Sequence, residues 1–198
     1  MSMINATKAL ALTLSLGFAG AAFAQETAQP AAPAAEAPAT EAPAKDGPGS
    51  VYVKETNDAW ETRCIRVEEG QAEPCQIYQL LKDEKGTSVA EMALFPLPAG
   101  QKAVAGATVS VPLETLLTEN LVLQVDANKA RVYPYSWCDQ IACVARLGFT
   151  AEDLAALKAG AKATLSLVPA RAPDQKVILN LSLKGITKGD DSLPVPAQ

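Results

Sequence analysis

Residues 176–183 read Lys-Val-Ile-Leu-Asn-Leu-Ser-Leu, the clearest secondary-structure signal in the chain. Apolar side chains recur there at every second position, namely at Val177, Leu179, Leu181 and Leu183. A period of two places these side chains on one face of an extended chain and the polar ones on the other. The stretch therefore predicts a strand of an antiparallel sheet with one buried and one solvated face.

Other short apolar or β-branched runs, separated by turn residues, have the same character, and we predict strands over 59–67, 75–82, 89–94, 108–111, 121–125, 130–137, 142–149 and 162–168. One helix is predicted near 151–159, because Thr150 and Asp153 form an approximate capping box before Leu154 and Leu157, and Gly160 can end the helix. Many strands with one short helix predict an all-β fold, an antiparallel sandwich or barrel.

The first 24 residues are typical of a secretory signal peptide. Lys8 precedes an apolar run over 9–22, and Ala22-Phe23-Ala24 fits the small-x-small cleavage rule, so we expect cleavage before Gln25. The alternative, an uncleaved membrane anchor, is disfavoured because the run is shorter than the roughly 20 residues that a spanning helix needs. We therefore predict a periplasmic or secreted protein with no membrane span in the mature chain.

Composition divides the rest of the chain. Residues 25–50 are rich in proline and alanine and carry nothing that can form a core, so we predict a disordered linker there. Residues 51–187 have a globular composition and the size of one domain. Residues 188–198 are again polar and contain proline, which predicts a flexible tail.

The amino-acid counts exclude several functions. The 198 residues contain no histidine, which removes histidine-based nucleophile pairs and imidazole metal ligands. A formal net charge of −5 makes a nucleic-acid partner improbable. No other motif for catalysis or phosphate binding is present, so we expect no catalytic residue, no cofactor and no metal site.

Four cysteines in an exported chain indicate two disulfides. Of the three possible connectivities we favour the local ones, Cys64 with Cys75 and Cys138 with Cys143, because turn-like segments separate the members of each pair. A four-cysteine zinc site or a redox centre is the alternative, and both are disfavoured because neither pair has the C-x-x-C spacing.

The segment 131–135 is a candidate binding edge. Pro134 inside a predicted strand indicates an edge strand, at which Tyr133 and Tyr135 offer rigid contact area and Arg131 adds positive charge to an acidic protein. The alternative is that one of these tyrosines fills the core. Trp60 and Trp137, each near a cysteine, are expected in the core, the alternative being that an exposed Trp forms part of a binding surface.

Several short motifs occur in an order that resembles the invasion-associated locus B family of α-proteobacterial envelope proteins. The resemblance covers 59–187 and is carried by Trp60 before Cys64, Pro74-Cys75-Gln76-Ile77, Pro112-Leu113, Leu121 to Asp126, Pro134-Tyr135 before Cys138, Cys143-Val144-Ala145, Leu154, Leu157-Lys158, Gly160 and Leu181 to Thr187. The chain departs from the family pattern at 117–121, where the family often has Leu-Pro-x-Gly-Leu, and at Ile186, which replaces a usual Phe.

The resemblance implies an antiparallel β-sandwich, immunoglobulin-like in outline, in the periplasm or at the outer surface. We therefore predict an exported, non-catalytic envelope protein that interacts with, or supports, an unknown envelope protein or polymer. The alternatives are a surface adhesin or invasion factor, since the family is linked to host-cell entry in some pathogens, and a module that binds a small ligand.

Overall fold

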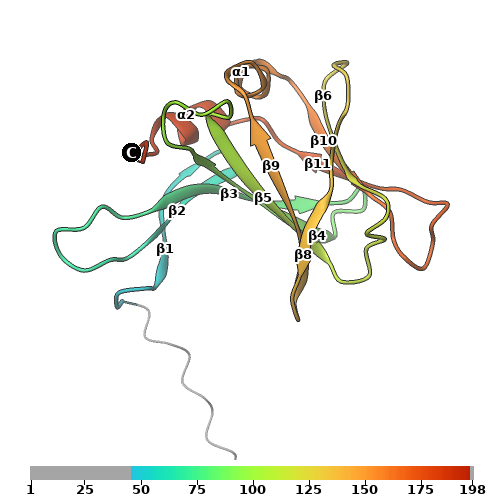
Figure 1. The fold of residues 1–198 in the computed structure, drawn as a ribbon, viewed down its shortest axis with the longest axis horizontal. Helices are drawn as coiled ribbons and strands as arrows, with labels where there is room; N and C mark the ends of the chain where they lie inside the picture. The colour runs from blue at the N-terminus through green and yellow to red at the C-terminus, as the bar shows by residue number, and fades with distance from the viewer. Residues whose placement is uncertain (1–45, 197–198) are drawn as a thin grey trace, which may run out of the picture. The chain divides into compact units, whose positions relative to one another are not determined.

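The computed structural model describes residues 46–196, and within them one antiparallel sheet and two short helices form (Figure 1). The elements are β1 Val51–Asn57, β2 Trp60–Ile65, β3 Cys75–Lys82, β4 Ser88–Pro96, β5 Ala105–Pro112, β6 Leu121–Val125, β7 Arg131–Tyr133, β8 Tyr135–Cys138, β9 Ala142–Phe149, α1 Ala151–Ala159, β10 Ala163–Leu167, β11 Val177–Leu181 and α2 Ile186–Asp191. The predicted signal peptide and residues 25–45 of the predicted linker lie outside the described residues.

The order of the strands shows how the sheet closes. Hydrogen-bonded neighbours follow the path β7-β6-β10-β11-β3-β4-β5-β9-β8, so β7 and β8 lie at its two ends. These end strands are consecutive in the chain, with Pro134 alone between them. The sheet must therefore curl until its ends meet, which makes it a nearly closed barrel. The prediction of an antiparallel all-β fold is confirmed, whereas the immunoglobulin-like sandwich is wrong, because a sandwich needs two separate sheets.

The sheet branches at β3. The first half of β3 pairs with β2, which in turn pairs with β1, whereas β11 pairs with the end of β3 through Asn180 and Lys82. Between these pairings the buried Gln79 replaces the backbone ladder: its amide accepts from Ser182 N at 2.8 Å and donates to Ser182 O at 2.9 Å. Trp60 Nε1 donates to the same oxygen at 2.9 Å. Side chains thus satisfy the backbone where the two branches separate.

Alternating burial confirms the strand predictions. Leu179, Leu181 and Leu183 are buried and Val177 packs partly against them, as the period of two predicts. Each predicted segment contains a strand, but 130–137 is split into β7 and β8 at Pro134. The prediction missed β1, whose side chains are largely exposed except for Asn57.

Helix α1 has the predicted bounds and capping box. Thr150 Oγ1 accepts from Asp153 N at 3.3 Å, and Asp153 Oδ2 accepts from Thr150 N at 3.0 Å. Gly160 follows the helix in an extended conformation, so it is not needed for a left-handed turn. Its lack of a side chain matters for packing instead, since a Cβ would lie 2.7 Å from Leu183 Cδ1.

Helix α2 corrects the predicted tail. Residues 188–193 are not flexible chain, because Ile186, Gly189 and Leu193 are buried. Lys158 of α1 pairs with Asp190 at 2.6 Å and with Asp191 at 2.7 Å. Burial alone lowers the pKa of Lys158, but the two carboxylates outweigh it and the pKa is raised. The polar sequence of α2 therefore reflects ion pairs across its exposed side.

The end of the predicted linker is also ordered. Residues 47–50 form a turn that is bonded to the backbone of Arg66. Arg66 O accepts from Gly49 N at 2.8 Å, and Arg66 N donates to Ser50 O at 2.9 Å. The prediction of a disordered linker up to residue 50 is therefore wrong for 47–50, because the two glycines allow a tight turn that pairs with the end of β2.

The structure joins the cysteines locally. Cys64 and Cys75 have their sulfurs 1.99 Å apart, and Cys138 and Cys143 have theirs 2.00 Å apart. Each pair occupies directly opposite positions of neighbouring antiparallel strands, β2 with β3 and β8 with β9. These are the connectivities that the sequence favours, and each crosslink holds a hairpin.

The close packing of Gly185 against Asn57 at the start of α2 can be tested by substitution. It precedes α2 with φ at +87°, and a Cβ there would lie 2.0 Å from Asn57 O. Gly86 has a similar φ of +83° but open space around it. We expect Gly86→Ala to lower the free energy of unfolding by about 1 kcal/mol through backbone strain. Gly185→Ala should lower it by about 3 kcal/mol or more, because a steric clash is added to the strain. Denaturant unfolding measures both, and equal losses would contradict this account.

Candidate functional site

The predicted binding edge lies where the barrel closes. We call residues 131–138, which comprise β7, Pro134 and β8, the seam strand. Its first part pairs only with β6 and its second part only with β9, so each part has one unpaired edge. Pro134 lies between them without an N–H group to donate. The structure therefore places Arg131, Tyr133 and Tyr135 on one edge segment; that a partner binds there stays a prediction.

The tyrosines of the seam strand face the core. Tyr133 and Tyr135 are partly buried against it, and the Tyr133 ring meets Phe149 edge-on at a centroid distance of 6.5 Å. Within residues 46–196, neither hydroxyl finds a hydrogen-bond partner. Burial raises the pKa of Tyr135 to about 12. Burial also raises the pKa of Tyr133, and the charge of Arg131 opposes that rise. The packing of these tyrosines therefore agrees better with the alternative, that they fill the core, than with the prediction that they form an exposed contact surface.

An ion pair connects the seam strand with α1. Arg131 pairs with Asp153, whose side chain is buried and also completes the capping box of α1. The Arg131 side chain as a whole remains about half exposed. The positive charge predicted at this edge is therefore partly compensated by a carboxylate of the same chain.

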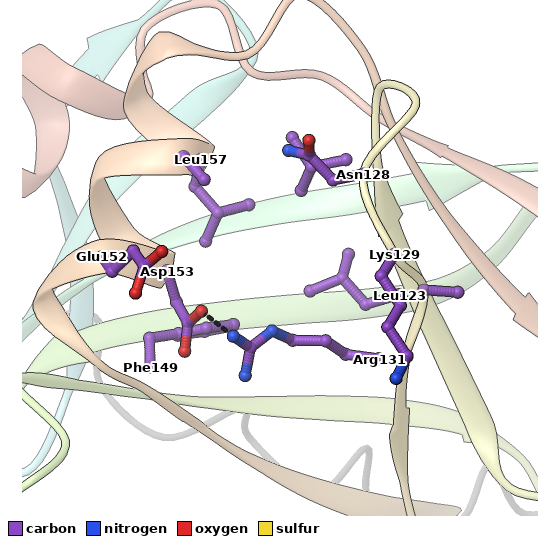
Figure 2. Close-up of a pocket in the computed structure, with 11 residues that line it drawn as sticks. Leu123, Asn128, Lys129, Arg131, Phe149, Glu152, Asp153 and Leu157 are labelled. Atoms are coloured by element: carbon purple, nitrogen blue, oxygen red, sulfur yellow. Dashed lines mark ion pairs between the residues drawn. The ribbon is translucent and has the colours of Figure 1, made fainter.

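A cavity of about 510 Å³ opens beside this ion pair (Figure 2). Its apolar floor consists of Leu123, Phe149 and Leu157, which are nearly fully buried. Charged groups stand at the rim: Lys129 and Arg131 on the β6–β7 side, Glu152 and Asp153 on α1. An apolar floor with few charged groups at the mouth is typical of a small-molecule pocket. We call it the seam cavity.

The hairpin of β8 and β9 exposes apolar side chains. A register shift between Tyr135 and Trp137 breaks the alternation, and Trp137 is 47 % exposed. Ile141, in the turn, is 85 % exposed. The expectation that Trp137 lies in the core is wrong, because the bulge turns it away; Trp60 is fully buried, as expected.

The tip of this hairpin is held in shape. Asp139 Oδ1 accepts from Ile141 N at 2.7 Å and from Ala142 N at 2.9 Å, next to the disulfide Cys138–Cys143. These backbone N–H groups lower the pKa of Asp139, and the Ala142 N–H has the larger effect. The carboxylate thus stays ionised and bonded well below neutral pH, and Ile141 is presented by a rigid turn.

Residues 46–196 contain neither a group of metal ligands nor a membrane-spanning helix. No group of three or more potential ligand side chains lies there in a position to hold a metal ion. No helix of this part is long and apolar enough to cross a membrane.

The chain is similar to a known protein family and to a solved structure. The model of the family described as "Invasion associated locus B (IalB) protein" matches residues 60–194. The chain belongs to this family. Among solved structures it is similar to the crystal structure of invasion associated protein B from Bartonella henselae, with 26 % identity, a TM-score of 0.55, and coverage of 68 % of this chain and 89 % of that one. No curated protein matches.

In this IalB family member, sequence reasoning found the seam strand but missed the groups around it. The sequence predicts a role for Asp153 in the capping box alone, whereas in the structure Asp153 also pairs with Arg131. A buried acid on an otherwise apolar helix face was the signal. The exposure of Trp137 and Ile141 carried no local signal, since it depends on the bulge and the turn.

The unpartnered hydroxyl of Tyr135 gives a test of its burial. Because a buried hydroxyl without a partner contributes no hydrogen bond, Tyr135→Phe should leave the free energy of unfolding at pH 7 unchanged or raise it by up to about 1 kcal/mol. Since the pKa is about 12 in the folded chain and ordinarily 10, wild-type stability should fall as the pH rises from 10 to 12.

The same substitution should make that fall smaller by on the order of 1 kcal/mol, allowing for the partial exposure of the ring. Chemical denaturation at pH 7, 10 and 12 measures it. Tyr78→Phe, whose hydroxyl bonds Glu91 at 2.9 Å, is the control and should cost stability at pH 7. If Tyr135→Phe costs as much as that control, its hydroxyl has a partner.

Proposed function

We propose that this IalB family member is an exported, non-catalytic envelope protein that binds an envelope protein or polymer through the β8–β9 hairpin. The observation that carries the proposal is the exposure of Trp137 and Ile141 on a hairpin that a disulfide and the Asp139 turn hold in shape. Membership of the family supports an invasion-associated envelope protein in general. Periplasmic location and the absence of catalysis are our own inference.

The hairpin has the properties of a protein interface. Tryptophan is among the side chains that supply most of the binding free energy at interfaces, and the exposed Ile141 adds apolar contact area close to it. A disulfide and the Asp139 turn fix their positions before binding, so little conformational entropy is lost on association. Strand β8 adds an unpaired backbone edge that an extended partner segment can join.

The non-catalytic part of the proposal rests on chemistry. The chain has no histidine, and all four cysteines are held in disulfides, so neither imidazole nor thiolate is available. The charged groups of the seam cavity are paired with one another or stand at its rim rather than converging on one point. This arrangement suits recognition better than proton transfer.

A double substitution tests the binding surface. Trp137→Ser with Ile141→Ser should abolish the recovery of crosslinked partners from the envelope, because both anchors are removed. Ile178→Ser is the matched control, since Ile178 is 44 % exposed on β11, and it should leave recovery unchanged. The free energy of unfolding of both variants should lie within about 1 kcal/mol of the wild-type value, because exposed side chains contribute little to stability. A folded double variant that keeps every partner would refute the proposal.

Export is tested at the N-terminus. We propose that the signal peptide is removed after Ala24, so the intact mass of the mature protein should correspond to a chain that begins at Gln25. Replacing Ala24 by a large residue such as Phe should block cleavage, because the peptidase accepts small side chains there. Recovery of processed protein at the same site in that variant would contradict the assignment.

A second candidate is a surface adhesin or invasion factor, favoured by the family description. It needs exposure of the hairpin outside the cell. Protease treatment of intact cells separates the two: cleavage of the chain favours the adhesin, and protection until the outer membrane is opened favours the periplasmic module.

A further inference from the structure

The seam cavity has no role in the hairpin binding proposed above. It lies at the α1 end of β9, whereas the hairpin lies at the other end of the same strand (Figures 1 and 2). A volume of about 510 Å³ is in the range of small-molecule pockets. The cavity therefore calls for an explanation of its own.

The charges at the rim are not equivalent. Asp153 is committed to Arg131 and to the backbone N–H of Thr150. Lys129 and Glu152 form no ion pair with any of residues 46–196. The side chain of Arg131 is 54 % exposed and also lines the cavity, so its pairing with Asp153 leaves part of it accessible. Lys129, which has no ion pair, and the exposed part of the Arg131 side chain thus both line the cavity above its apolar floor.

We propose that the seam cavity binds a small amphiphilic anion, with a carboxylate or similar head group between Lys129 and Arg131 and a short alkyl or aryl body on Leu123, Phe149 and Leu157. Arg is suited to bidentate recognition of such a head group, and Lys adds a second charge. Burial of the apolar body supplies the driving force. Because the chain as a whole is acidic, an anion is held by these local cations and not by the overall field.

Octanoate, far below its micelle-forming concentration, is the probe. Titrated into the purified protein and followed by amide chemical shifts, it should move the signals of Asn128, Lys129 and Glu152 with one common dissociation constant. Octylammonium has the same apolar body with the opposite charge and should bind about tenfold more weakly. Equal affinity for the two probes, or an absence of shifts at these residues, would overturn the proposal.

Two pairs of variants locate the site. Ala156 lines the cavity, whereas Ala155 is exposed on the same helix. Ala156→Leu should fill the cavity and reduce octanoate affinity at least tenfold, while Ala155→Leu should leave it unchanged. Lys129→Gln should weaken binding about threefold, and Lys85→Gln in the β3–β4 turn should have no effect. An unchanged affinity of Ala156→Leu would overturn the proposal.

A second apolar groove, lined by Ile65, Phe95 and Val195, is where octanoate would bind if its apolar chain alone decided the site. Shifts confined to that groove would also overturn the proposal. Recovery of hairpin partners by Ala156→Leu is expected to stay at the wild-type level, so the outcome here is independent of the partner experiment.

Discussion

The single residue between β7 and β8 constrains the whole sheet. Pro134 joins the two strands that end the hydrogen-bonded path, so the path has to curl back on itself. A proline cannot donate to a ladder, and its fixed φ prevents a smooth continuation. The strand therefore pairs with β6 before Pro134 and with β9 after it, and it leaves an opening on either side. The seam cavity lies at one opening, where α1 approaches β7 and Arg131 reaches Asp153.

Buried polar groups differ between the branch of β3 and the seam strand: those at the branch have hydrogen-bond partners, and two at the seam have none within the described residues. At the branch of β3, Gln79 and Trp60 satisfy the backbone of Ser182, so the separation of two strand pairs leaves no unpaired group at that residue. At the seam, the hydroxyls of Tyr133 and Tyr135 are buried without partners within the described chain. The backbone at the branch is thus fully hydrogen-bonded at Ser182, whereas the two tyrosine hydroxyls at the seam could still each form a hydrogen bond.

Local features of the sequence predicted much of the fold. The alternation of 177–183, the capping box at Thr150 and the short cysteine spacings all depend on neighbouring residues. Sheet closure was not predictable in this way, because it depends on pairings such as β3 with β11, about 100 residues apart. Helix α2 was missed because its acids pair with Lys158, more than 30 residues earlier. At the site, the sequence predicted which residues form the edge strand, but it did not predict that Tyr133 and Tyr135 face the core and that Trp137 faces solvent.

Two of the edge strands of the sheet, β1 and β8, differ in a way that bears on function. Edge strand β1 carries Lys54 and Glu55 and a register shift, which are features that keep an edge from pairing with other chains. Edge strand β8 reads Tyr-Ser-Trp-Cys and has no charged residue. The family match begins at Trp60, so it includes the seam and both disulfides but not β1. Charged side chains thus protect edge strand β1 from pairing with another chain, whereas β8 is an uncharged edge beside the exposed Ile141, so β8 is the edge better suited to contact with a partner.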